Sequence, residues 1–155
     1  MNMERLVRSQ QMPISLETAW QFFSDPANLS QITPPSLNLK VISELPGHTY
    51  PGMIASYTIT PIGPFKFTWV TEITHTAEPN YFVDEQRFGP YRFWHHQHRF
   101  REIPGGVSMD DSVHYLLPYW PVGMALAKYV ASQLSVIFDY REEALRRIFG
   151  EYVLP

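Results

Sequence analysis

Residues 123–149 constrain the fold more than any other stretch of this sequence. They form the longest run with one sustained period, and no Pro or Gly interrupts it. Apolar residues recur at spacings of three or four positions, or a sum of these, as on one face of an α-helix. They are Leu126, Val130, Leu134, Ile137, Leu145 and Ile148. Such a helix would be about 40 Å long, so the rest of the chain must cover its apolar face.

Shorter elements are predicted near the N-terminus. Glu4–Met12 alternates loosely and predicts a strand. Ser15 is a favourable N-cap for a short helix, and Asp25 caps a second one that has Pro26 at its first position. The first helix carries three aromatic residues that we expect in the core under the sheet, Trp20, Phe22 and Phe23.

From residue 39 onward the apolar pattern changes to period two, which is typical of strands. The predicted strands are residues 39–43, 53–60, 65–76, 81–88, 91–103 and 107–117. Turns with Pro or Gly join the last three, which should form an antiparallel meander. The order of elements predicts an α+β fold, in which a curved antiparallel sheet of about six to seven strands wraps the long C-terminal helix and leaves a hollow.

Length and composition limit the classes of protein to which the chain can belong. With 155 residues, 45% of them apolar and 17% charged, it should form one globular domain over residues 1–155. The aromatic content of 15% suggests a bulky core or a lined pocket. A net charge of −3 without a basic run disfavours a nucleic-acid partner. The absence of cysteine excludes a disulfide scaffold and thiol catalysis.

We expect a cytoplasmic protein. The first ten residues are polar and lack the apolar segment of a signal peptide. Lys128 and Gln133 interrupt the long helix, which is therefore not expected to span a membrane. A monomer or a weak homodimer is expected.

The densest group of chemically versatile side chains lies in the predicted strand 91–103. Alternate residues of a strand share one face. The odd-numbered residues of this strand end in two arginines, Arg99 and Arg101, so we expect the odd-numbered face to lie toward solvent. The inner set is then Trp94, His96, His98 and Phe100. Two imidazoles in an aromatic interior are costly unless each finds a hydrogen-bonding partner.

Partners for these histidines are expected on the two neighbouring strands. The inward set of residues 107–117 is mostly apolar, and the even residues of 81–88 would approach the histidines across the hairpin if they also face inward. The candidates are Phe82, Asp84 and Gln86 on one strand, and Asp111 and Tyr115 on the other. A few polar groups in an aromatic wall are typical of ligand pockets.

This polar group has three interpretations. Carboxylates could fix the tautomers of core histidines and do nothing else. The group could be the polar end of a ligand pocket. A His–Asp pair could also serve as a general base with its orienting residue.

A metal site is a further interpretation of the same residues. His96 and His98 could converge on Zn²⁺ or Fe²⁺, with Asp111 or Asp84 as the third ligand. No further helix-borne histidine completes a familiar site, and the flanking aromatic residues suit a stacked layer. We therefore expect no metal and no cofactor.

The order of elements, together with a set of motifs, resembles the SRPBCC superfamily, which comprises START lipid-transfer domains, birch-pollen-allergen-like proteins and polyketide cyclases. The motifs are Asp25-Pro26 with Leu29 and Thr33-Pro34, residues 82–86, Gly89-Pro90, Trp94 with His96 and His98, and Asp111 with Tyr115 and Pro118. The most similar group is the bacterial ligand-binding SRPBCC domain proteins, some of which are fused to sugar-epimerase-like domains. The resemblance implies a helix-grip fold with an apolar cavity. Members of the superfamily include both carriers and enzymes.

The leading hypothesis is binding or transport of a small hydrophobic ligand, lipid-like or aromatic and polyketide-like, between the sheet and the long helix. The predicted ligand-binding residues are Tyr57, Trp69, Phe82, Asp84, Gln86, Trp94, His96, His98, Phe100, Asp111 and Tyr115. One alternative is a cyclase- or dehydratase-like enzyme that uses a His–Asp pair as acid and base. Another is an interaction module for an epimerase-like partner. Residues 119–121, just before the long helix, could form a gate or a packed loop.

Overall fold

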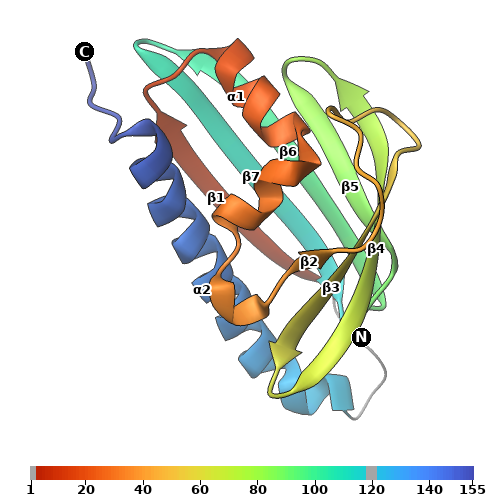
Figure 1. Cartoon of the computed structure of the whole chain (residues 1–155). Coiled ribbons are helices and arrows are strands. Elements are labelled where there is room, and N and C mark those ends of the chain that lie inside the picture. Colours follow the sequence, from red (N-terminus) through yellow and green to blue (C-terminus); the bar gives the residue numbers. More distant parts are fainter. Residues whose placement is uncertain (1–2, 118–121) are drawn as a thin grey trace.

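A curved antiparallel sheet lies against one long helix in the computed structural model, which describes residues 3–117 and 122–155 (Figure 1). The described residues form seven strands in the order β1-β7-β6-β5-β4-β3-β2. The strands are β1 (Glu4–Met12), β2 (Lys40–Val41), β3 (Ile54–Ile62), β4 (Phe65–Ala77), β5 (Tyr81–Phe88), β6 (Phe93–Ile103) and β7 (Gly106–Leu116). The first strand thus pairs with the last, and the predicted helix-grip α+β fold is confirmed.

The helices gather on one face of the sheet (Figure 1). They are α1 (Leu16–Ser24), the 3-10 helices η1 (Pro26–Ile32) and η2 (Pro35–Leu37), and α2 (Val122–Phe149). The predicted caps are present: the Ser15 side chain accepts a hydrogen bond from the Thr18 amide, and Asp25 accepts one from the Ala27 amide. Trp20 on α1 is buried and meets the rings of Phe82 and Phe100 edge-on.

Some elements differ from the sequence predictions. The strand predicted at 39–43 shrinks to Lys40–Val41. The second short helix is a 3-10 helix, and η2 follows it although no helix was predicted there. Residues 119–121, considered as a gate, lie outside the described residues.

Helix α2 buries a face that is slightly rotated from the predicted stripe. Leu134 and Leu145 are buried as predicted, but Ile148 is 41% exposed and Leu126 is 37% exposed. Phe138, which was not in the predicted stripe, is buried. No helix among residues 3–117 and 122–155 is long and apolar enough to cross a membrane.

Candidate functional site

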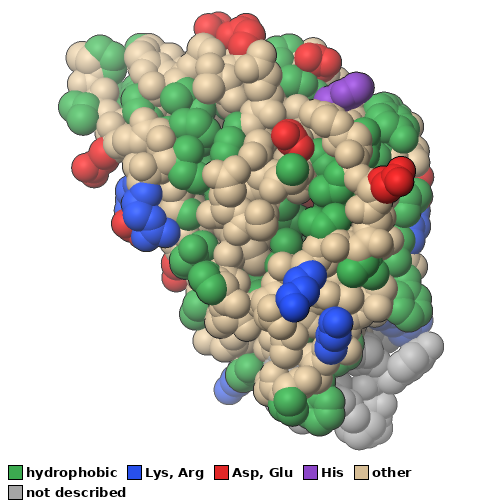
Figure 2. Space-filling model, in the orientation of Figure 1, with side chains coloured by type: hydrophobic (Ala, Val, Ile, Leu, Met, Phe, Trp, Pro, Cys, Tyr) green, Lys and Arg blue, Asp and Glu red, His purple; other side chains and the backbone are tan. Residues whose placement is uncertain are grey.

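A cavity of about 370 Å³ lies between the sheet and α2, with α1 and η1 at its rim. This size falls within the range of small-molecule sites. Figure 2 shows hydrophobic side chains exposed in a hollow at the centre of this face. Aromatic residues make a large part of the lining: Phe22, Phe23, Tyr57, Phe67, Trp69, Phe82, Tyr91, Trp94, Tyr129 and Phe138.

Four ionisable side chains from three adjacent strands form a polar cluster at the cavity wall: Asp84, His96, His98 and Asp111. The register of the sheet places Asp84 opposite His96, and His98 opposite Asp111. Because opposite and diagonal residues on one face of a sheet are neighbours, each histidine reaches both carboxylates. This polar cluster keeps its name below.

The polar cluster is tightly hydrogen-bonded. The distance from His96 Nε2 to Asp111 Oδ1 is 2.7 Å, and that from His98 Nε2 to Asp84 Oδ2 is also 2.7 Å. The second nitrogens are farther away: His98 Nδ1 is 3.1 Å from Asp111 Oδ1, and His96 Nδ1 is 3.4 Å from Asp84 Oδ2. The two imidazole centroids are 3.8 Å apart, and the Phe82 ring stacks on His98 at 4.1 Å. Each imidazole therefore has, at its Nε2 atom, the carboxylate partner that burial requires.

The arrangement shifts the two histidine pKa values in opposite directions. Burial, reinforced by the charge on His98, lowers the pKa of His96 below 6.5. Burial also opposes the charge on His98, but its contacts with Asp111 and Asp84 outweigh burial and raise the pKa of His98 above 6.5. These directions favour a protonated His98 beside a neutral His96.

Both carboxylates of the polar cluster are held ionised. Burial by itself would raise the pKa of Asp111, but hydrogen bonds from His96 and His98 outweigh it and keep this pKa well below 3.8. The pKa of Asp84 is also lowered, against burial, by its electrostatic interaction with His96 and by the hydrogen bond from His98. Across the cavity, burial and the nearby charge of Asp84 raise the pKa of Tyr57 to about 12, so its hydroxyl stays protonated.

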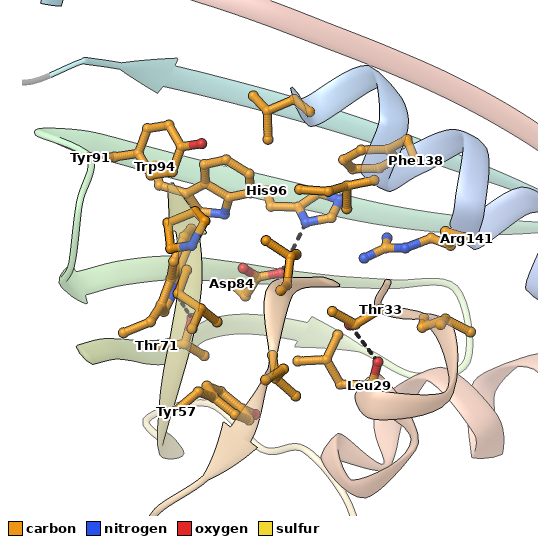
Figure 3. A pocket seen from close by; sticks show the side chains of 18 of the residues that line it. Leu29, Thr33, Tyr57, Thr71, Asp84, Tyr91, Trp94, His96, Phe138 and Arg141 are labelled. Atoms are coloured by element: carbon orange, nitrogen blue, oxygen red, sulfur yellow. Dashed lines mark hydrogen bonds and ion pairs between the residues drawn. The ribbon is translucent and has the colours of Figure 1, made fainter. Parts of the chain in front are cut away.

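Arg141 of α2 adds a cation to this wall. Its guanidinium lies over the Phe138 ring at 4.7 Å, and Arg141 Nη1 is 3.6 Å from Asp111 Oδ2. In Figure 3 the guanidinium points into the cavity from the helix side, near His96 and Asp84. With His98 protonated, two cations balance the two carboxylates.

Seven of the eleven predicted site residues line the cavity. They are Tyr57, Trp69, Phe82, Asp84, Trp94, His96 and His98.

The other four predicted site residues lie behind or beside the lining. Asp111 is buried behind the histidines, and Phe100 packs in the core against Trp20. Tyr115 belongs to a second core cluster with Trp94. The Gln86 side-chain amide is hydrogen-bonded to the backbone of Tyr91 at the end of the β5–β6 hairpin.

The sequence predictions missed Arg141, Tyr91 and Phe138. Tyr91 belongs to the predicted strand 91–103 but lies just before β6, from where it lines the cavity. Arg141 lies seven positions after Leu134 and four before Leu145, so helical spacing places it on the apolar face. That spacing was the available signal.

Asp84, His96 and His98 are also the group best placed to hold a cation. Each offers one ligand atom, and these atoms all lie within 4.8 Å of one another. Two imidazoles and one carboxylate suit a first-row divalent ion. Such an ion would have to replace the 2.7 Å hydrogen bond from His98 to Asp84.

The sequence was compared with models of protein families and with curated proteins. A family model described as "Polyketide cyclase / dehydrase and lipid transport" matches residues 12–150. No curated protein matches the sequence.

Several solved structures share the fold. Protein CV1439 from Chromobacterium violaceum is similar with a TM-score of 0.72 and 10% identity, over 96% of this chain and 98% of that chain. Protein Ms6760 from Mycobacterium smegmatis has a TM-score of 0.63 and 20% identity, over 93% and 92%. A nucleoside-diphosphate sugar epimerase from Corynebacterium glutamicum has a TM-score of 0.64 and 22% identity, over 90% of this chain but only 28% of that longer chain.

Proposed function

Because the chain belongs to the polyketide cyclase/dehydrase and lipid transport family, we propose that it binds a small, ring-containing or lipid-like hydrophobic ligand between the sheet and α2. Family membership confirms the resemblance to the SRPBCC superfamily, and the fold is a hydrophobic ligand-binding fold. The observation that carries the proposal is the cavity of about 370 Å³ with its aromatic lining and one polar wall.

The predicted residues divide into two roles in this proposal. The ligand body contacts the aromatic wall of Tyr57, Trp69, Phe82 and Trp94. Its polar end meets Asp84, His96 and His98. Asp111, Gln86, Phe100 and Tyr115 act from behind as positioning residues, because they support lining residues without facing the cavity themselves.

Native mass spectrometry of the protein purified from its own cells tests the proposal, together with a binding panel of lipids and aromatic polyketides. We expect a bound small molecule, or binding of at least one apolar class in the panel. An empty protein that binds no member of the panel would contradict the proposed function.

The opposed pKa shifts in the polar cluster favour a second candidate, an enzyme that cyclises, dehydrates or isomerises such a ligand. Two titratable neighbours whose environments separate their pKa values are the usual arrangement of a catalytic acid and base. A neutral His96 that donates from Nε2 to Asp111 has an unprotonated Nδ1, which can accept a proton. His98, with its raised pKa, would be the acid.

Replacing the imidazoles separates the enzyme from the carrier. His98→Gln and His96→Gln keep much of the side-chain volume but remove titration near neutral pH. In an enzyme, each variant should still bind the ligand while turnover falls by about 10²–10⁴-fold. If ligand binding is lost and the parent never shows turnover, only the carrier remains.

An epimerase-like protein partner is a third proposal. Its support is that the fold of this chain also occurs inside a longer chain described as a sugar epimerase. Co-purification of this protein from its own cells should then recover an epimerase-like protein, and recovery of none would contradict the third proposal.

Cytoplasmic location and a monomeric or weakly dimeric state stay predictions.

A further inference from the structure

Arg141 is a buried cation with unused donors. The side chain is 11% exposed and lines the cavity. Among the described residues, its Nε and Nη1 atoms have no hydrogen-bonding partner. Leaving charged donors unsatisfied in a buried site is costly, so these atoms indicate a missing acceptor.

The nearest acid does not satisfy Arg141. Asp111 Oδ2 lies 3.6 Å from Nη1, beyond the length of a normal charge-assisted hydrogen bond. The other oxygen of that carboxylate is bonded to His96 and lies within 3.1 Å of His98. Asp84 is engaged by His98 as well. The histidines therefore take the strongest interactions of both carboxylates.

The guanidinium also packs against an aromatic ring. It lies over the Phe138 ring, with a distance of 4.7 Å from its central carbon to the ring centroid. The planar guanidinium suits a bidentate interaction with two oxygens in one plane, and packing on the ring reduces the freedom that it loses on binding.

We infer that the ligand carries an acidic oxygen group, such as a carboxylate, and that Arg141 binds it at the α2 side of the cavity. This inference deepens the proposed function and rests on it. The ligand class is thereby narrowed from any apolar molecule to an apolar acid.

A second donor lies farther along the same wall. The Trp94 indole Nε1 is buried without a hydrogen-bonding partner among the described residues. Figure 3 shows Trp94 and Arg141 on opposite sides of His96, both at the cavity. The indole N–H is thus a second donor at this wall that lacks an acceptor.

Two fluorescent probes test the inference. Anilinonaphthalene sulfonate carries an acidic group, and phenylnaphthylamine has the same rings without it. In titrations of the purified protein, Arg141→Met should lower the affinity for the sulfonate probe about tenfold or more, as expected for loss of a charge-assisted hydrogen bond. Binding of the uncharged probe should change by less than about twofold. Arg141→Lys, which keeps the charge, should retain part of the preference for the sulfonate probe over the uncharged probe.

Arg147→Met is the matched control, because Arg147 lies on the same helix with a side chain that is 56% exposed and pairs with Glu143. It should leave both probes unaffected. Equal effects of Arg141→Met on both probes, or none on either, would overturn the inference. If Arg141→Met does not fold, Arg141→Lys takes its place in the test. The inference is overturned if Arg141→Lys weakens binding of the sulfonate probe no more than binding of the uncharged probe. If neither probe binds the parent, the proposed function fails together with the inference.

Discussion

At the scale of single residues, Asp111 shows how a side chain that never faces the cavity can determine its chemistry. It lies within 3.1 Å of both imidazoles of the polar cluster and faces Arg141 at 3.6 Å. The two histidines compete for the same pair of carboxylates, and the raised pKa of one accompanies the lowered pKa of the other. The charge state of the wall is therefore a property of the whole cluster.

The pKa shifts predict opposite pH dependences for the two imidazoles. The folded pKa of His98 is raised, so its stabilising effect is complete below about 6.5 and is lost as pH rises through the folded pKa. The folded pKa of His96 is lowered, so stability falls as pH drops below 6.5, where the unfolded state takes up the proton. NMR titration of the imidazole resonances should show His98 titrating above 6.5 and His96 below it. A His98 that is neutral at pH 6.5 would contradict this assignment.

At the scale of elements, the periodic spacing of apolar residues predicted most of the helices and strands, because burial of one face requires that spacing. Strand β6 alternates, and this alternation was enough to place His96 and His98 inside. Helical spacing could not reveal how far the covering surface extends, so Ile148 fits the period of α2 yet is exposed. The spacing of Arg141 puts it on the apolar face of α2, but a charged side chain is ordinarily expected in solvent, which is why Arg141 was missed. Its burial depends on partners from β7 and on the cavity, which no local pattern contains.

The phase of α2 can be tested by a pair of substitutions. Leu134→Asp should abolish cooperative folding, because Leu134 is buried and an unpaired charge there has no partner. Val136→Asp is the control, since Val136 is 53% exposed on the same helix and surface changes usually alter the free energy of unfolding by about 0.5 kcal/mol or less. Thermal melting monitored by circular dichroism compares them. Similar melting temperatures for Leu134→Asp and the parent would show that the orientation of α2 is wrong.

At the scale of the whole molecule, the sheet and α2 enclose a cavity instead of a filled core, and binding should depend on that volume. Val130 lines the cavity from α2. Val130→Trp should occupy part of the space and weaken binding of apolar ligands about tenfold or more, equivalent to ~1.4 kcal/mol. Val136→Trp, on the exposed side of the helix, should leave binding unchanged. Isothermal titration with phenylnaphthylamine measures both, and equal affinities for parent and Val130→Trp would place the ligand elsewhere.

The pairing of β1 with β7 also has a consequence for how the protein is made. Glu4 and Tyr115 are neighbours in the sheet although they stand about 110 positions apart in the chain. At a synthesis rate of about 5–20 residues per second, β7 is synthesised roughly 5–20 s after β1, its partner strand. Helix α2 follows later still, and it supplies one wall of the cavity. Until that helix has left the ribosome, the nascent chain has no complete pocket, so ligand can be captured only after translation has passed α2.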